Sequence, residues 1–466
     1  MTDAAIAHRR DTAFFGHPAG LGWLSFTELW ERFSYYGMLG LLPLYLVHFL
    51  LQPGHAANVI GFGAFQGFIA ALYGPAATAQ GLGAHITSFY AATVYATPLL
   101  GGYLADRYLG RTTSVTIGAL LMAFGHFLMA FQASFVFALF FLIAGVGFFK
   151  GNIASQVGGL YSTDDPRRAN AFQIFLLAVQ IAVIASPLIC GTLGEVYSWD
   201  LGFGAAGVGM LIGLTIYLMG RPALPPEPPR TAKDRAAVPP LTRNDWFKVA
   251  ALIALLPVLA VGIVGNQQIS NAYPIWTERS IEMTFFGLLM PTTWLQSVDA
   301  IVSTFTMVLV IGFWRWWETR FTEPDELMKI AIGVAVSALA PLALAAAAMF
   351  SASTHHKAGF EWILLFEIIN DIGFANVLPV GLALYSRAAP KSITGLIIGV
   401  YYLHLVAGNW FTGVVAGKLE LMPATSFWLL HVGLMAGAAA VLLLAKLLFG
   451  RLLAPAYTEA EAAAAR

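Results

Sequence analysis

The 466-residue chain is 58% hydrophobic and 11% charged, with a formal net charge of zero. This composition excludes a water-soluble domain of this size and predicts an integral membrane protein. The zero net charge gives no indication of a nucleic-acid partner, and the single cysteine, Cys190, excludes an internal disulfide.

Twelve apolar stretches are each long enough to cross a bilayer as a helix. Strands of a membrane barrel would instead be segments of about ten residues that alternate apolar and polar positions. The sequence therefore predicts an all-α membrane protein with twelve transmembrane helices. We expect these helices near residues 24–51, 84–104, 113–131, 134–160, 170–190, 200–219, 247–269, 293–314, 328–350, 360–385, 393–416 and 425–449.

Lysine and arginine residues are distributed unevenly between the predicted helices. If both termini lie on one side, the segments on that side hold 20 of the 25 basic residues, and the other side holds only Arg279, Lys357 and Lys418. The remaining two, Arg32 and Lys150, lie within helices. Basic residues favour the cytoplasmic side, so we expect a bacterial inner-membrane protein with both termini in the cytoplasm. The first residues show no apolar core that ends at a small-residue cleavage site, so we expect no cleaved signal peptide.

Two long connections organise the predicted helices. Residues 52–83, on the outside, are predicted to form short surface helices or a re-entrant cap, because a further span there would destroy the charge asymmetry. Residues 221–245 are rich in proline and charge and are predicted to form an extended cytoplasmic linker. The linker separates a six-helix bundle of residues 1–220 from a second one of residues 246–450, which precedes a tail of residues 451–466. Transporters built from two such halves bind substrate between them near the midplane.

Three ionisable residues, Glu28, Glu31 and Arg32, lie inside the first apolar stretch. A lone charge near the bilayer centre costs about 3 kcal/mol on insertion scales, so this helix must face protein or a water-filled cavity. On a helix, Glu28 lies one turn from both Glu31 and Arg32, so the three can pair with one another. A carboxylate held in this way can take up or release a proton as its neighbours change. We therefore expect the function to depend on this cluster.

The segment GGYLADRYLGRTTS, residues 101–114, follows the second predicted helix. Its glycines permit two helices to meet closely, and Asp106, Arg107 and Arg111 can pair there. This pattern resembles the loop signature of the major facilitator superfamily between its second and third helices. An ordinary charged turn is the alternative interpretation.

The segment ELWERFSYYG in the first helix resembles the motif of the proton-dependent oligopeptide transporters, a branch of that superfamily. The similarity extends over nearly the whole chain, with GVGFFKGNIASQVGGLY, MPTTWLQSVDAIVS and LPVGLALYSRAAP as further matching segments. The resemblance implies the major facilitator fold with two six-helix bundles. It also implies that Glu28 and Glu31 take part in proton coupling, and that Arg32 and Lys150 receive the carboxylate of a peptide.

The chemistry of these residues agrees with a peptide ligand, which needs a cation for its carboxylate and aromatic walls for its side chains. Arg32 offers a planar fork and Lys150 a point charge. Tyr35, Tyr36 and Tyr95 supply aromatic surface with hydroxyl groups. Alternatively, Lys150 extends to an interface, or the tyrosines only pack.

The second half departs from the family pattern where the substrate amino group is expected. Counting back from Pro379, the position of the family's usual glutamate holds Phe374. A phenylalanine cannot bind an ammonium group by charge or carry a proton. Asp371 lies one turn earlier, and Asp299 occupies a position where relatives usually have asparagine. We expect Asp371, Asp299 or both to replace the missing carboxylate; alternatively, either one pairs locally with Asn370 or lies close to an aqueous end of its helix.

Other positions of the implied binding site also differ from the family pattern. In the fifth helix Leu176 replaces the usual tyrosine and Gln180 the usual asparagine. In the seventh helix Gln267 is kept, while Ile269 stands where glycine is usual. Tyr401 replaces a tryptophan of the eleventh helix. These differences suggest that the ligand is a modified or N-blocked peptide, or another small carboxylate.

We therefore expect a proton-coupled symporter that imports small peptides by alternating access, driven by a proton gradient. No cofactor, metal ion or catalytic residue is expected, and the protein is predicted to be a monomer that interacts with its substrate, protons and the lipid bilayer. An exporter and a non-transporting ligand sensor on the same fold are alternatives. An integral-membrane enzyme is disfavoured, because the histidines, such as His126 and His404, are isolated in the sequence.

Overall fold

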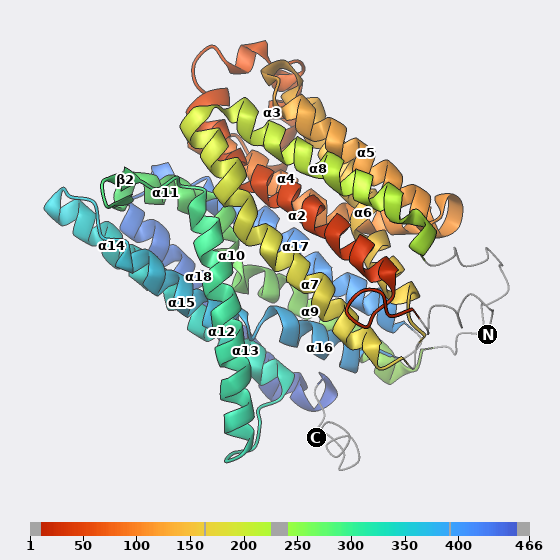
Figure 1. Cartoon of the computed structure of the whole chain (residues 1–466). Helices are drawn as coiled ribbons and strands as arrows, with labels where there is room; N and C mark the ends of the chain where they lie inside the picture. Colours follow the sequence, from red (N-terminus) through yellow and green to blue (C-terminus); the bar gives the residue numbers. More distant parts are fainter. Residues whose placement is uncertain (1–10, 163–164, 225–240, 391–392, 454–466) are drawn as a thin grey trace. The chain divides into compact units, whose positions relative to one another are not determined.

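The computed structural model describes residues 11–162, 165–224, 241–390 and 393–453. The backbone contacts divide the chain into two units. The first unit comprises residues 1–232 and 284–300, and the second comprises residues 233–283 and 301–466. Both units are helical bundles in their described parts (Figure 1). Most of the predicted linker, most of the predicted tail and the first ten residues lie outside the described residues.

Eleven helical stretches of the described chain are long and apolar enough to cross a membrane. They account for every predicted span except the second, which was expected near residues 84–104. That span corresponds to helix α4 (Ala79–Leu104), which has 26 residues and is therefore also long enough to cross. Its lower hydropathy follows from its Gly, Thr, Gln and His residues.

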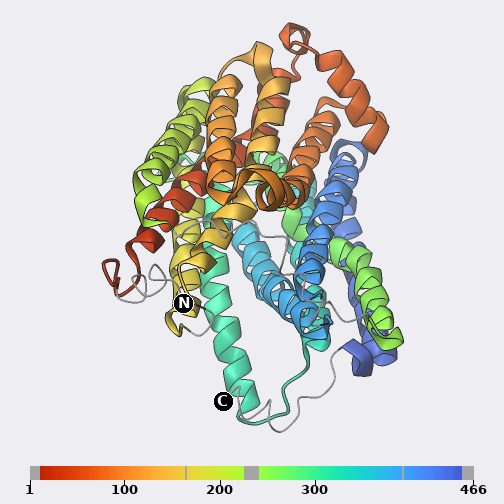
Figure 2. The same ribbon diagram turned by 90° about the vertical axis from the view of Figure 1, so that its right-hand side faces the viewer.

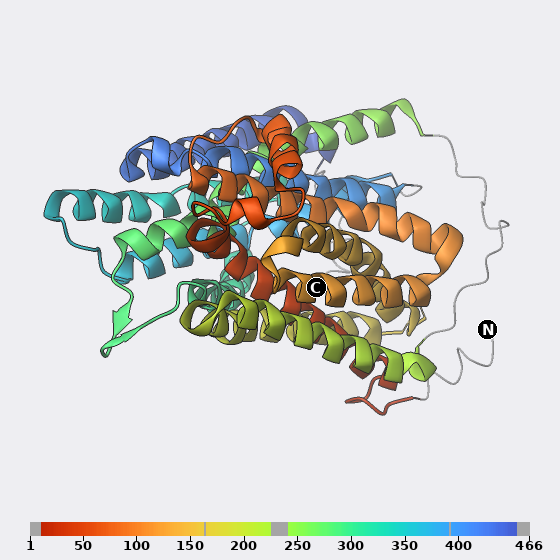
Figure 3. The ribbon, with the colours of Figure 1, turned by 90° about the horizontal axis from the view of Figure 1, so that it is seen from above.

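The first unit is built around helix α2, most of whose residues are buried. Helix α2 packs closely against α7 and α8, while α6 packs against α4 and α5. Viewed as in Figure 3, α2 runs between α8 and α6. The helices of this unit are α2 (Ala19–Tyr45), α3 (Phe62–Tyr73), α4 (Ala79–Leu104), α5 (Arg111–Met129), α6 (Phe135–Gly159), α7 (Arg167–Ser186), α8 (Trp199–Gly220) and the beginning of α12 (Trp294–Glu318).

Glycine pairs bring the helices of the first unit into backbone contact. A Cβ atom at Gly101 of α4 would lie 1.9 Å from the carbonyl oxygen of Gly147 in α6. Similarly, a Cβ atom at Gly118 of α5 would lie 2.7 Å from the carbonyl oxygen of Gly145. Small residues at such crossings allow the close packing on which helix association in membranes depends.

The connection between α4 and α5 contains one of the predicted charge pairs. Arg111 Nε lies 3.7 Å from Asp106 Oδ1. Arg107 instead donates a 3.2 Å hydrogen bond to the hydroxyl of Tyr103 and lies over the Tyr103 and Tyr108 rings. The Asp106–Arg111 pair is therefore confirmed, whereas Arg107 contacts aromatic side chains.

The connection at residues 52–83 forms short helices, as predicted. A 3₁₀ turn spans Ala56–Asn58, and α3 has only 12 residues. This length is below the roughly 20 residues that a transmembrane helix needs. Phe62, Phe65 and Ile69 form one buried face of α3, so the helix lies along the unit rather than crossing a membrane.

The second unit contains several helices that are interrupted within the predicted spans. The ninth predicted span divides into α13 and α14, and the tenth divides into α15 and α16, where Pro379 lies in the first turn of α16. Interrupted helices are where transporters commonly place binding groups. The helices of this unit are α9 (Arg243–Gly262), α10 (Val264–Gln267), α11 (Ala272–Ser280), the remainder of α12, α13 (Glu326–Ser337), α14 (Ala340–Thr354), α15 (Glu361–Phe374), α16 (Leu378–Ala388), α17 (Thr394–Ala416) and α18 (Ala424–Leu453).

Two short strands, β1 (Thr284–Phe285) and β2 (Leu288–Leu289), form a hairpin that the all-α prediction does not contain. Its turn places Phe286 and Gly287 at φ of 52° and 83°. Positive φ at both central residues is the requirement of a tight hairpin turn, which glycine meets without strain.

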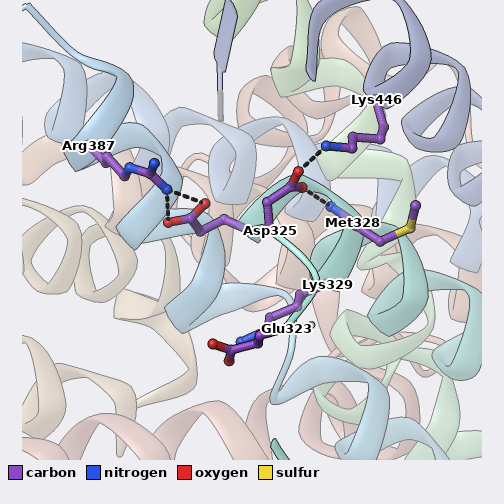
Figure 4. Close-up of polar contacts among 7 residues, drawn as sticks. Glu323, Asp325, Met328, Lys329, Arg387 and Lys446 are labelled. Carbon is purple, nitrogen blue, oxygen red and sulfur yellow. Dashed lines mark hydrogen bonds and ion pairs between the residues drawn. The ribbon is translucent and has the colours of Figure 1, made fainter. Parts of the chain in front are cut away.

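Ion pairs connect α13 to α16 and α18 in the second unit (Figure 4). Arg387 Nη1 lies 2.9 Å and 3.0 Å from the two carboxylate oxygens of Glu326. Asp325, the residue before α13, accepts hydrogen bonds from the Met328 backbone N–H and from Lys446 of α18. These contacts join the ends of three helices and occupy the Lys446 ammonium group.

Candidate functional site

Arg32 binds both acidic residues of the first-helix cluster. Its Nη2 donates a 2.7 Å hydrogen bond to Glu31 Oε1, and its Nε lies 3.1 Å from Glu28 Oε1 and also bonds Glu31 Oε2. At most 5% of each of the three residues is exposed. The predicted internal pairing is therefore confirmed, and it explains how α2 accommodates three charges in an apolar environment.

The two carboxylates of this cluster are bound differently. Both oxygens of Glu31 accept hydrogen bonds from the Arg32 guanidinium. Glu28 uses one oxygen for Arg32, and its Oε2 is buried without a hydrogen-bond partner among the described residues. A buried acceptor without a partner is energetically unfavourable unless a proton or a ligand group reaches it.

Aromatic rings border the cluster. The Arg32 guanidinium carbon lies 5.1 Å from the ring centre of Tyr35, which in turn packs against Tyr36 at 5.0 Å and Tyr90 at 6.3 Å. Contact between a guanidinium and an aromatic face is stabilising. Tyr90 of α4 was not predicted as a site residue, although it lies in the same sequence segment as Tyr95.

Lys150, in the middle of α6, lies beside another ring of this region. Its ammonium nitrogen is 4.5 Å from the ring centre of Tyr95 on α4. Lys150 also lies near enough to Glu28 and Glu31 to interact with their charges. Helices α2, α4 and α6 of the first unit thus bring two cations, two carboxylates and several tyrosines together.

Asp299 and Gln180 are both half-buried in the first unit. Asp299 lies on the first part of α12, close enough to Tyr36 of α2 for an electrostatic interaction. Gln180 lies on α7. This part of α12 is fixed to α7 near both residues, because Ser297 Oγ donates a 2.7 Å hydrogen bond to the Ile184 carbonyl oxygen.

Glu195, which the sequence analysis did not single out, binds the segment that begins α12. Its carboxylate accepts hydrogen bonds of 2.8 Å from the backbone N–H groups of Thr292 and Thr293, and one of 2.6 Å from the Thr293 hydroxyl. The Thr192 hydroxyl accepts a further bond of 2.9 Å from Trp294 Nε1. An isolated acid shortly after the end of the fifth predicted span was the available signal.

In the second unit, two acids lie one turn apart on α15. Glu367 and Asp371 are at most 2% exposed. Glu367 Oε1 accepts a 2.6 Å hydrogen bond from the hydroxyl of Tyr273 on α11. Asn370 Nδ2 donates a 3.3 Å hydrogen bond to Asp371 Oδ1, so the local pairing that the sequence left open is present. Tyr273 was not predicted, because aromatic residues are common in apolar helices.

The other predicted residues of the second unit lie on three helices. Phe374 is the last residue of α15 and is half-buried. Tyr401 of α17 is buried, and its hydroxyl donates a 2.7 Å hydrogen bond to the Leu378 carbonyl oxygen. Tyr401 thereby stabilises the interruption between α15 and α16. Gln267 is half-buried at the end of α10, next to Gln268, whose amide contacts His431 at 3.0 Å.

The sequence profile of the POT family matches residues 112–238 and 232–429. The chain belongs to the POT family. The family resemblance is thus confirmed, and with it a transporter family rather than an enzyme family.

Several bacterial relatives match most of this POT family chain. A di-/tripeptide transporter of Lactococcus lactis subsp. cremoris is 28% identical over 85% of this chain and 88% of its own length. The peptide transporter YePEPT of Yersinia enterocolitica is 26% identical over 92% of this chain and 94% of its own length. The uncharacterized transporter YclF of Bacillus subtilis is 27% identical, with coverage of 89% and 91%.

Solved POT structures share the fold of this chain. A crystal structure of a mutant peptide transporter POT in complex with alafosfalin superposes with a TM-score of 0.82 at 24% identity, covering 97% of this chain and all of that one. A POT family transporter in complex with a thioalcohol-conjugated peptide gives 0.78 at 23% identity, with coverage of 97% and 100%. The predicted major facilitator fold is therefore confirmed.

Proposed function

We propose that this protein is a proton-coupled symporter that imports small peptides or peptide-like compounds across the bacterial inner membrane. The observation that carries the proposal is the buried cluster in which Arg32 is held by Glu28 and Glu31, with Lys150 nearby. Membership of the POT family and relatives described as di-/tripeptide transporters support the substrate class. The uneven distribution of basic residues supports cytoplasmic termini.

In this proposal the substrate carboxylate competes with the two glutamates for Arg32. The planar guanidinium binds one carboxylate through two parallel N–H groups, as it binds Glu31 here. Protonation of a glutamate removes its charge and weakens its hold on Arg32. Once Glu28 is neutral, the substrate carboxylate competes with Glu31 alone for the guanidinium, while Lys150 supplies a second positive charge.

Glu28 is the residue that we assign to proton uptake. Protonating Glu31 would weaken both hydrogen bonds of the guanidinium fork, whereas protonating Glu28 affects only the Arg32 Nε contact. Glu28 Oε2 is also buried without a hydrogen-bond partner among the described residues, so it can accept a proton without breaking another bond. Both considerations favour Glu28 over Glu31 as the site of proton uptake.

The amino group of the substrate is proposed to interact with Asp371, Asp299 or both, because Phe374 stands where the family usually has an acid. Asp371 Oδ1 accepts a long hydrogen bond of 3.3 Å from the Asn370 amide. An ammonium group would provide a stronger, charge-assisted bond. If neither acid contacts the amino group, the substrate is expected to have a blocked amino end.

Uptake into liposomes under an imposed pH gradient tests the proposal. An inwardly directed proton gradient should accelerate accumulation of a labelled dipeptide, and collapsing the gradient with a protonophore should remove the acceleration. Arg32→Lys retains the charge but lacks the fork, so it should raise the substrate concentration needed for half-maximal uptake. Uptake that does not respond to the gradient would refute proton coupling.

The same preparation separates the alternatives. An exporter would accumulate substrate in vesicles whose cytoplasmic face is outward, with the opposite response to the gradient. A sensor would bind peptides saturably, measured by thermal stabilisation, without any flux. Comparing free and N-acetylated dipeptides in that binding assay identifies the preferred amino end.

A further inference from the structure

An apolar groove lies between α9 and α18 of the second unit, with a volume of about 590 Å³. The two helices run side by side and are visible along the lower right of Figure 2. Ala250, Ala251 and Ala254 line the groove from α9, and Val441 and Leu448 line it from α18. Almost all of its walls are hydrocarbon side chains.

Three of the side chains that line the groove from α9 are small alanines, Ala250, Ala251 and Ala254. In the first unit the corresponding first and last spans are α2 and α8, and there large rings fill the space between them. A Cβ atom at Gly220 would lie 2.6 Å from Trp23 Cβ, and one at Gly213 would lie 3.1 Å from Trp30 Cβ. The groove of the second unit is lined at the equivalent place by the three alanines of α9.

The groove has the length of one bilayer leaflet. Along α9 its lining runs from Asn244 to Val258, which corresponds to about 21 Å at the helical rise per residue. One leaflet of the hydrocarbon core is about 15 Å thick, so the groove also reaches headgroup depth. In the apolar membrane-spanning stretch of each helix, only 39% of the α9 residues and 28% of the α18 residues are buried within the protein. Both helices therefore face lipid. One acyl chain fits this path.

Basic side chains lie at the end of the groove that reaches headgroup depth. The Arg243 guanidinium carbon is 5.5 Å from the ring centre of Phe247, which lines the groove, and Lys248 follows on the same turn. Asp245, the neighbouring acid, accepts hydrogen bonds of 2.9 Å and 2.7 Å from the backbone N–H and hydroxyl of Thr242. Among the described residues, neither Arg243 nor Lys248 has a carboxylate within ion-pair distance.

We propose that this groove binds one acyl chain of an anionic phospholipid whose phosphate contacts Arg243 and Lys248. Basic residues at the end of a span attract anionic headgroups, and the leaflet concerned is the one predicted to be cytoplasmic. Lys446, close by on α18, is already paired with Asp325 and takes no part. The proposal does not depend on the transported substrate.

Native mass spectrometry of the full-length protein tests this inference, using equal amounts of phosphatidylglycerol and phosphatidylcholine of identical chains. Each basic residue near the surface favours an anionic headgroup by about 1 kcal/mol, so two residues predict that the first lipid bound is phosphatidylglycerol roughly 30 times more often than phosphatidylcholine. Arg243→Gln combined with Lys248→Gln should reduce this ratio to about one. Ala254→Phe should reduce the retention of both lipids, because its ring occupies the acyl path.

The matched control is Arg221→Gln combined with Arg315→Gln, which removes two exposed basic residues at the ends of other helices. This control should keep the preference, as should Arg243→Lys. Size-exclusion chromatography and the melting temperature confirm that each variant is folded. Equal retention of the two lipids by the unmodified protein would overturn the proposal. So would an equal loss of preference in the control, which would show that net charge rather than this groove selects the lipid.

Discussion

The hydroxyl of Tyr273 donates a 2.6 Å hydrogen bond to Oε1 of Glu367, and both side chains are completely buried in the second unit. Hydrogen bonds to an ionised acceptor contribute about 1.5–3 kcal/mol, against about 0.5–1.5 kcal/mol for neutral pairs. The energetic effect of removing the hydroxyl therefore reports the charge of Glu367.

We predict that Tyr273→Phe lowers the melting temperature more than Tyr385→Phe. Tyr385 is the matched control, because it is equally buried and its hydroxyl donates a 2.6 Å bond to a neutral acceptor, the Leu252 carbonyl oxygen. Thermal unfolding followed by tryptophan fluorescence in detergent measures both. Equal losses would show that the Tyr273–Glu367 bond contributes no more than a bond to a neutral acceptor, contrary to this prediction.

Glu28 and Glu31 are predicted to respond differently to neutralisation. Glu28→Gln should abolish the response of uptake to a pH gradient while exchange of preloaded substrate continues, because the Arg32–Glu31 bonds remain. Glu31→Gln should destabilise the protein more than Glu28→Gln does, because it disrupts both hydrogen bonds of the guanidinium fork, whereas Glu28→Gln alters a single contact of Arg32. Liposome exchange assays and melting curves separate the two effects. Loss of exchange in Glu28→Gln with wild-type stability would contradict the assignment.

Asp299→Asn and Asp371→Asn test which acid binds the substrate amino group. We predict that at least one of them weakens the binding of free dipeptides by roughly 10- to 100-fold, the equivalent of one charge-assisted hydrogen bond. Binding of N-acetylated dipeptides should change little. Glu361→Gln, which removes an exposed acid at the other end of α15, is the control. Unchanged uptake and binding in both variants would rule out the relocated acid.

Gly101 and Gly102 provide a matched pair for helix packing. A Cβ atom at Gly101 would lie 1.9 Å from the Gly147 carbonyl oxygen, whereas one at Gly102 would have no atom within 4 Å. Gly101→Ala should therefore force α4 away from α6 and lower the melting temperature. Gly102→Ala should leave it unchanged or raise it slightly, because alanine favours the helix by about 1 kcal/mol. Similar melting temperatures for the two variants would mean that these helices do not pack as described.

His17, before α2, predicts a pH-dependent contribution to stability. Its Nδ1 lies 2.9 Å from the Tyr161 hydroxyl, and burial, followed by the charge of Arg167, lowers the pKa of His17, while Asp165 acts in the opposite direction. The unfolded chain therefore binds more protons than the folded protein once the pH falls below about 6.5. The stabilisation from neutral His17 is present above that pH and is lost as the pH falls below it.

Melting curves between about pH 8 and about pH 5 test this dependence. The difference in melting temperature between the unmodified protein and His17→Gln should decrease as the pH falls. His355→Gln, which changes an exposed histidine just after α14, controls for the removal of one imidazole. A difference that stays constant or grows towards acid pH would contradict the prediction.

The sequence by itself determined the class of the protein and its central motif. Transmembrane helices are specified locally, because about 20 consecutive apolar residues must satisfy their backbone groups within one helix whatever their neighbours are. The spacing of Glu28 and Arg32 likewise determined their contact, since residues four apart on a helix are neighbours, whereas the bonds between the adjacent residues Glu31 and Arg32 do not follow from helical spacing. These three residues also belong to the motif by which the first helix resembles the family.

Only the tertiary structure decided which residues from different helices meet. Tyr90 beside Tyr35, Tyr273 beside Glu367, and Glu195 at the start of α12 are contacts between segments that are far apart in the sequence. In an apolar helix, periodicity does not distinguish a lipid-facing side from a protein-facing side, because both are hydrophobic. The groove between α9 and α18 was not predictable for the same reason. It depends on how the side chains of two helices meet, and the sequence of either helix alone does not specify this.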